Sequence, residues 1–149
     1  MSQEKIKDEP SSPNTYAGFV SLIGVPNAGK STFLNRVIGQ KLAIVTPKVQ
    51  TTRTRIIGIK NINFSQIIFV DIPGIIKPRG NLNHSMMDIA WSSIKESDLH
   101  ILLVDCAKKQ EQIIEENKLI FDTLGDEIKK TILVINKIDK LDKNKLFKI

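Results

Sequence analysis

The chain has 149 residues, of which 41% are hydrophobic and 26% charged, as in an ordinary globular protein with one domain and a substantial core. Its single cysteine, Cys106, excludes an intrachain disulfide and fits a reducing compartment, so we expect a cytoplasmic protein. No apolar run approaches the roughly 20 residues that span a bilayer, and none is typical of an N-terminal signal sequence.

The net charge of +6 is concentrated towards the C-terminal end. Between Lys129 and Ile149, seven lysines and two aspartates give a balance of +5, which leaves +1 for the rest of the chain. Such a cluster is typical of a solvated lysine-rich surface, and it also occurs on surfaces that bind nucleic acid or anionic lipid. The sequence leaves both interpretations open.

Hydrophobic spacing predicts alternating strands and helices after a polar lead-in. Turn-forming residues predict a disordered segment at residues 1–16, and Pro47 with its neighbouring threonines predicts an exposed loop at Gln40–Arg53. The predicted strands are Gly18–Gly24, Arg55–Ile59, Gln66–Asp71, Leu99–Asp105 and Thr131–Asn136, and the predicted helices are Ser31–Ile38, Leu82–Ile94 and Ile113–Leu124.

The pattern within the strands predicts the fold class. A turn at Asn61–Asn63 would make its two flanking strands antiparallel neighbours. The continuous apolar runs LHILLVD and TILVIN are instead typical of strands that are buried in a parallel sheet. Together with the alternating helices, these strands predict an open α/β fold with a mostly parallel sheet.

A glycine-rich stretch joins the first predicted strand to the first predicted helix. It reads GVPNAGKS and matches G-x-x-x-x-G-K-[ST] in the setting that a phosphate-binding loop requires. Glycines let backbone N–H groups surround an anion, and the helix directs its positive end at the same place. We expect Lys30 to reach the β- and γ-phosphates and the Ser31 hydroxyl to bind Mg²⁺. The predicted nucleotide contacts are Gly24, Val25, Pro26, Asn27, Ala28, Gly29, Lys30, Ser31 and Thr32.

A second motif, DIPG, ends the strand IIFVD. A carboxylate at Asp71 can hold Mg²⁺ through water, and the Gly74 N–H can sense a γ-phosphate. The pattern D-x-x-G alone is weak evidence for a nucleotide site, and its place on a strand after the phosphate loop strengthens that evidence. The residues predicted to bind nucleotide here are Asp71, Ile72, Pro73 and Gly74.

A third motif, NKID, begins at the last residue of the strand TILVIN and is predicted to select the base. The Asp139 carboxylate can accept hydrogen bonds from guanine N1–H and N2–H₂, whereas adenine would leave it unpaired. We expect Asn136 to bond the major-groove edge of the base and the Lys137 stem to cover its ring. Asn136, Lys137, Ile138 and Asp139 are therefore the predicted guanine contacts.

The chain resembles the translation-factor-related bacterial GTPases, within the TrmE-Era-EngA-like P-loop family and its Era branch. The similarity runs through GVPNAGKSTFLNRVIGQKLAIVTPKVQTTRTRIIGI, VDIPGI and NKID. It implies a three-layer Ras-like domain, GTP/GDP and Mg²⁺ as cofactors, and GTP hydrolysis as a switch in small ribosomal subunit assembly and rRNA maturation. The implied partners are guanine nucleotide, small-subunit rRNA and the ribosomal subunit, and peripheral contact with the inner face of the cell membrane is a further expectation.

The same resemblance implies a first switch loop at Gln50, Thr51, Thr52, Arg53 and Thr54, although a threonine-rich linker is the simpler alternative. Thr52 is the first choice for a Mg²⁺ ligand and Thr51 the second. Ile75 stands where Ras-like proteins carry a glutamine that orients water, so we expect slow intrinsic hydrolysis. Asn27 matches an asparagine of potassium-stimulated relatives, which implies K⁺ near the phosphates. The catalytic residues expected are Asn27, Lys30, Thr52 and Gly74.

Relatives continue after NKID with a strand, a Ser-Ala loop, a helix and an RNA-binding KH domain. We therefore expect residues 17–149 to be a C-terminally incomplete GTPase domain with an apolar sheet edge at TILVIN, which folds poorly or binds nucleotide weakly. A non-catalytic nucleotide-binding or interaction module and an ATP-using enzyme are the alternatives.

Several conspicuous side chains are interpreted as structural. We expect Trp91, Met86 and Met87 in or near the core, no metal role for His84 and His100, and exposed strand positions for Arg53 and Arg55.

Overall fold

The computed structural model describes residues 14–40, 56–72, 74 and 90–141. In these ranges one five-stranded sheet has the order β2-β3-β1-β4-β5. The pair β2–β3 is antiparallel, and the pairs β1–β3, β1–β4 and β4–β5 are parallel. The predicted α/β fold, with a mostly parallel sheet, is therefore confirmed. The strands are β1 (Tyr16–Ile23), β2 (Ile56–Ile62), β3 (Ser65–Asp71), β4 (Leu99–Asp105) and β5 (Thr131–Asn136).

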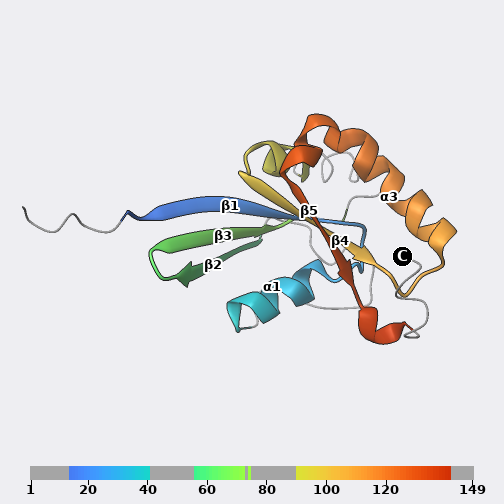
Figure 1. Ribbon diagram of the computed structural model, residues 1–149, viewed down its shortest axis with the longest axis horizontal. Coiled ribbons are helices and arrows are strands. Elements are labelled where there is room, and N and C mark those ends of the chain that lie inside the picture. The colour runs from blue at the N-terminus through green and yellow to red at the C-terminus, as the bar shows by residue number, and fades with distance from the viewer. Residues whose placement is uncertain (1–13, 41–55, 73, 75–89, 142–149) are drawn as a thin grey trace, which may run out of the picture.

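Helices lie on both sides of the sheet (Figure 1). Helix α1 (Lys30–Ile38) contacts β2 and β3, and α3 (Gln110–Leu124) contacts β4 and lies on the opposite side. Residues 90–95 are also helical, and the 3₁₀ helices η1 (Gly125–Lys130) and η2 (Ile138–Lys140) flank β5. The predicted three-layer arrangement is confirmed. None of the helices in the described ranges is long and apolar enough to cross a bilayer.

The core forms around the two central strands. Successive side chains of a strand point to opposite faces of the sheet. Leu22 and Ile23 in β1 and Leu102 and Leu103 in β4 are nevertheless all fully buried, which shows that both faces are covered there. The helices complete this core with apolar side chains that include Leu34, Ala90, Ile94, Ile120 and Leu124, and Trp91 packs against it.

Two predicted boundaries were wrong. The turn between β2 and β3 lies at residues 63–64, because β2 continues to Ile62. Asn63 has φ 51°, a left-handed conformation that asparagine tolerates better than most residues. Tyr16, which the sequence placed in the lead-in, begins β1, and its N–H donates to the Phe64 carbonyl. Pairing with β3 thus extends the first strand.

The prediction that TILVIN is a buried strand was also wrong. Ile132 and Leu133 are 49% and 53% exposed. In the described part of the chain, β5 pairs with β4 alone and forms the outer edge of the sheet. The expected apolar edge is therefore present at this strand.

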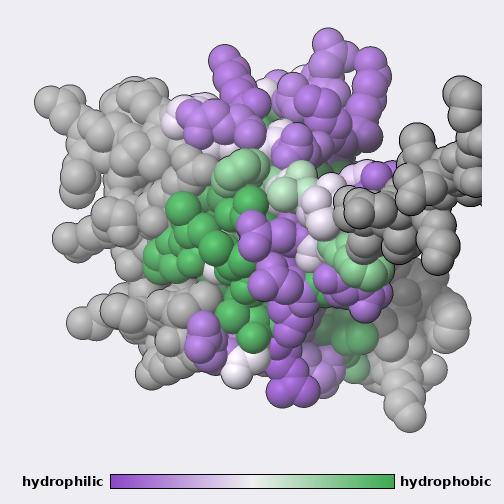
Figure 2. Space-filling model, turned by 90° about the vertical axis from the view of Figure 1, so that its left-hand side faces the viewer, coloured by the Kyte–Doolittle hydropathy of each residue, from purple (hydrophilic) through white to green (hydrophobic). Residues whose placement is uncertain are grey.

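Exposed apolar side chains also gather around the β2–β3 hairpin. Figure 2 shows an apolar patch, with polar side chains above it and to its right, on the side of the molecule where this hairpin lies. The exposed hydrophobic residues of the hairpin and the adjoining strand are Tyr16, Phe19, Ile57, Ile59, Ile62 and Phe64.

Candidate nucleotide site

The three predicted motifs meet at one edge of the sheet. The phosphate loop follows β1, Asp71 ends β3 and Asn136 ends β5. These three strands are parallel, so their carboxyl ends share the edge where open α/β sheets bind ligands. The topology therefore assembles a single candidate site from segments far apart in the sequence.

The backbone of the phosphate loop turns sharply before α1. Asn27 has φ 63° and Gly29 has φ 104°, both in the left-handed region. A Cβ atom on Gly29 would collide with the Asn136 amide nitrogen. Glycine is thus required here by backbone conformation and by the close approach of the guanine motif.

Lys30 lies across the loop with its ammonium group buried. Its Nζ donates to the carbonyl oxygens of Gly24 (3.0 Å) and Val25 (3.2 Å). Burial lowers the pKa of Lys30 to about 8, although the nearby Asp71 carboxylate opposes this shift. A cation is therefore held over the loop in an environment that favours additional negative charge.

Ser31 and Asp71 form the candidate Mg²⁺ site beside this lysine. Ser31 Oγ donates to Asp71 Oδ2 at 2.6 Å, and the carboxyl group is fully buried. Burial raises the pKa of Asp71, against smaller opposing effects of the Ser31 hydrogen bond and the Lys30 charge. Asp71 Oδ1 has no hydrogen-bond partner among the described residues. A hydroxyl and an unpartnered carboxylate oxygen fit the oxygen ligands that Mg²⁺ prefers.

The DIPG segment lies directly against the phosphate loop. A Cβ atom on Gly74 would be 2.7 Å from the backbone nitrogen of Pro26. Only glycine allows this approach, which brings the Gly74 backbone beside the loop where a γ-phosphate is predicted.

The guanine motif is bonded to the same loop. Asn136 Nδ2 donates to the Ala28 carbonyl (2.8 Å) and Lys137 Nζ to the Asn27 carbonyl (2.7 Å). Asp139 lies exposed in η2, immediately beyond these anchors. The sequence assigned Asn136 and Lys137 to the base, and it did not reveal that they also bind the loop.

Two groups at the end of β4 were missed by sequence reasoning. Asp105 Oδ2 accepts a hydrogen bond from Lys137 Nζ at 2.6 Å. The Cys106 N–H and thiol both donate to the Asn136 carbonyl, at 3.1 and 2.8 Å. The only available signal was that LHILLVD ends in aspartate at the same edge as IIFVD.

Several predicted site residues lie outside the described residues. These are the switch residues Gln50, Thr51, Thr52, Arg53 and Thr54, the DIPG residue Pro73, and Ile75, and the same holds for Arg55, His84, Met86 and Met87. Their roles stay predictions.

Residues 19–137 match the family model described as "50S ribosome-binding GTPase". The chain belongs to this GTPase family. Among curated relatives, GTPase Era of Geobacter metallireducens is 46% identical over 127 residues, which cover 85% of this chain and 42% of the relative. GTPase Era of Mesorhizobium japonicum is 43% identical over 129 residues, covering 87% and 41%. The predicted resemblance to Era is confirmed, and the chain spans about two fifths of the length of these relatives.

Solved structures of Era share the fold of this chain. A crystal structure of Era in complex with MgGDPNP and nucleotides 1506–1542 of 16S ribosomal RNA has a TM-score of 0.79 and 42% identity, covering 89% of this chain and 45% of that one. An Aquifex aeolicus Era variant bound to GDP·AlF₄⁻ has a TM-score of 0.75 and 41% identity, covering 83% and 42%.

The buried His100 belongs to a polar chain that lies away from the nucleotide motifs and reaches the surface. His100 Nδ1 lies 2.8 Å from Ser21 Oγ, and its Nε2 lies 3.2 Å from Glu127 Oε2. Lys130 pairs with the same carboxylate at 3.1 Å. The hydrogen bonds from His100 and Lys130 lower the pKa of Glu127. Sequence spacing did not reveal this partner of His100, because Glu127 comes 27 residues later.

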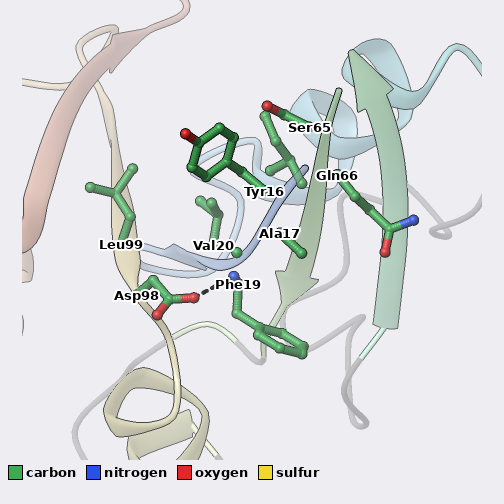
Figure 3. A pocket seen from close by; sticks show the side chains of 10 residues that line it. Tyr16, Ala17, Phe19, Val20, Ser65, Gln66, Asp98 and Leu99 are labelled. Atoms are coloured by element: carbon green, nitrogen blue, oxygen red, sulfur yellow. Dashed lines mark hydrogen bonds between the residues drawn. The ribbon is translucent and has the colours of Figure 1, made fainter. Parts of the chain in front are cut away.

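The opposite end of the sheet carries a groove that is separate from the nucleotide motifs. It has a volume of about 390 Å³ and is lined at the starts of β1, β3 and β4 (Figure 3). At its border the Phe19 N–H donates to Asp98 Oδ2 at 2.7 Å. None of the predicted site residues lines this groove.

Proposed function

We propose that this chain binds guanine nucleotide with Mg²⁺ and hydrolyses GTP to GDP and phosphate. The observation that supports this most is the pair of hydrogen bonds between the guanine motif and the phosphate loop. Asn136 and Ala28 are 108 residues apart, and Lys137 and Asn27 are 110 apart. These bonds fix the base-reading and phosphate-binding segments relative to one another before a ligand binds, which reduces the cost of ordering them.

The phosphate half of the proposed site combines a cation with oxygen ligands. The Lys30 ammonium would bind phosphate oxygens, the Ser31 hydroxyl would bind Mg²⁺, and the Asp71 carboxylate would hold the ion through water. Bound Mg²⁺ supplies positive charge that stabilises the phosphates during transfer. The MgGDPNP complex of the similar Era structure supports this assignment.

The base half is tested by the variant Asp139→Asn. An amide can donate to O2 of xanthine and accept from its N1–H. Guanine has the donor N2–H₂ in place of O2, and this donor needs the second acceptor oxygen that only the carboxylate provides. We expect the variant to bind xanthosine diphosphate (XDP) more tightly than GDP and the original chain to prefer GDP, each by about five- to 150-fold, since an unpaired polar group costs about 1–3 kcal/mol. Unchanged preference for GDP in the variant would contradict base reading by Asp139. ADP competing as well as GDP in the original chain would favour the ATP-using alternative.

A non-catalytic nucleotide-binding module is the second candidate, and Ile75 is the observation that favours it. An isoleucine cannot orient the attacking water, so catalysis needs another source of stabilisation. We propose that Asn27 recruits K⁺ for this purpose. Single-turnover release of phosphate separates the candidates: faster release in K⁺ than in Na⁺ supports the enzyme and its potassium site. No release in either buffer supports the non-catalytic module.

We further propose that the nucleotide cycle serves small ribosomal subunit assembly, with small-subunit rRNA as partner. The support comes from the similar Era that was crystallised with a 16S rRNA fragment. Cosedimentation of the chain with small subunits should depend on GTP rather than GDP. Equal cosedimentation in both nucleotides would argue against a switch.

A further inference from the structure

The carboxylate of Asp105 is buried behind the guanine motif and is fully engaged. Asp105 is only 7% exposed. Its Oδ1 accepts from the Ala107 N–H at 3.0 Å, which fixes the carboxylate plane, and its Oδ2 accepts from Lys137 Nζ at 2.6 Å. Lys137 Nζ in turn donates to the Asn27 carbonyl at 2.7 Å. A continuous polar chain therefore runs from the end of β4 through Lys137 to the phosphate loop.

The backbone around Lys137 needs such an anchor. Lys137 has φ 63°, a left-handed conformation that costs a residue with a side chain roughly 1–2 kcal/mol. On its N-terminal side the Asn136 carbonyl is held by the Cys106 N–H and thiol. Residues 105 and 106 thus bind the two residues that place the guanine motif on the loop.

We propose that Asp105 is a positioning residue for nucleotide binding that acts through Lys137. This inference rests on the proposed guanine-nucleotide function. The carboxylate neutralises the Lys137 charge and restricts a long side chain that would otherwise regain rotamer freedom. In this position the Lys137 stem can cover the ring of the base, and its ammonium group holds the phosphate loop through the Asn27 carbonyl.

A double-mutant cycle on GDP affinity tests the coupling. Asp105→Asn keeps the shape of the side chain and removes its charge, and Lys137→Met keeps the stem and removes the ammonium. We expect Asp105→Asn alone to raise the Kd for GDP about tenfold, because it breaks a buried charge pair. In the Lys137→Met background it should change the Kd by less than about twofold, since no ammonium remains to be positioned.

The matched control is Asp126→Asn, which removes an exposed ion pair with Lys129 far from the motifs. It should leave the Kd within about twofold, as expected for surface pairs. Asp105→Asn effects of equal size in both backgrounds would overturn the inference, because Asp105 would then act independently of Lys137.

A second measurement needs no nucleotide and uses the only thiol of the chain. Cys106 is buried and donates to the Asn136 carbonyl, so its reaction with dithiodipyridine reports opening of this junction. We expect Asp105→Asn and Lys137→Met each to accelerate the reaction by about tenfold well below the melting temperature, and Asp126→Asn to leave it unchanged.

Lys137→Met is the decisive variant in this assay. Burial raises the pKa of the Cys106 thiol, Asp105 raises it further and Lys137 lowers it. Losing Lys137 therefore disfavours the reactive thiolate, and faster reaction can come only from opening of the junction. Unchanged rates in both variants would overturn the inference. Absence of GDP binding by the original chain would refute the proposed function, while the thiol rates would still decide whether Asp105 holds Lys137.

Discussion

Burial of Lys30 makes nucleotide affinity depend on pH. In the nucleotide-free chain the pKa of Lys30 is about 8, and phosphates bound beside it would favour the charged form. Above this pKa, binding must therefore take up a proton. The protonated fraction falls from about nine tenths at pH 7 to about one tenth at pH 9, so the Kd for GDP should rise about tenfold, or about 1.4 kcal/mol.

Calorimetric titration in two buffers of different ionisation enthalpy measures both the Kd for GDP and the number of protons taken up on binding. At about pH 9 we expect uptake of nearly one proton per GDP bound, and almost none at about pH 7. Lys30→Arg is the matched control, because a guanidinium stays charged throughout this range. Any pH dependence that this variant retains belongs to the base or to other groups. A Kd that stays flat between the two pH values, with no proton uptake, would refute the reasoning.

As the pH rises, the affinity for GDP should fall, whereas the stability of the nucleotide-free chain should increase. The folded-state pKa of Lys30 is lowered from 10.5 to about 8, so between these values the unfolded chain binds more protons. The Lys30 contribution therefore increases the free energy of unfolding as the pH rises through about 8 to 9. Denaturant melts at the same pH values would show whether weaker GDP binding reflects loss of folding instead.

Four further changes have defined outcomes. Gly29→Ala should abolish measurable GDP binding in a fluorescence titration, because its Cβ would collide with Asn136, and normal binding would contradict the loop geometry. Asp71→Asn should raise the melting temperature of the nucleotide-free chain, since the raised pKa of this carboxyl shows that its charge is unfavourable there, yet it should remove the Mg²⁺ dependence of GTP binding. Asn117→Leu should stabilise the chain by about 1 kcal/mol in denaturant melts, because removal of its buried Oδ1, which has no partner among the described residues, outweighs loss of the Nδ2 hydrogen bond to the Ile113 carbonyl; a lower midpoint would show that the amide is needed. Ile132→Lys should reduce self-association in analytical ultracentrifugation by placing a charge on the exposed edge strand.

The sequence was sufficient for features that rest on local patterns. The continuous apolar run of β4 has the length and composition of a buried strand, and the glycine-rich loop follows β1 directly. Parallel strands place their carboxyl ends together, so the sequence alone assigns Asp71 and Asn136 to one edge of the sheet. The order of elements was thus enough to predict the location of the site.

Contacts between distant segments could not be predicted in this way. Asp105 and Lys137 are 32 residues apart, and neither their spacing nor their types distinguish this pair from other surface charges. The exposure of β5 was misjudged because its apolar composition resembles that of β4, whereas burial depends on which strands lie beside it. The composition of a strand shows which environments it can tolerate, whereas the elements packed beside it determine how far it is buried.

The place of β5 in the sheet affects how long a ligand stays bound. This strand leads directly into the residues that read the base, yet within the described sheet it is hydrogen-bonded along one side only. Edge strands open more readily than central ones, so amide exchange should be faster in β5 than in β1. The lifetime of the bound nucleotide would then be limited by fraying at the rim of the sheet, while the phosphate-binding half stays closed.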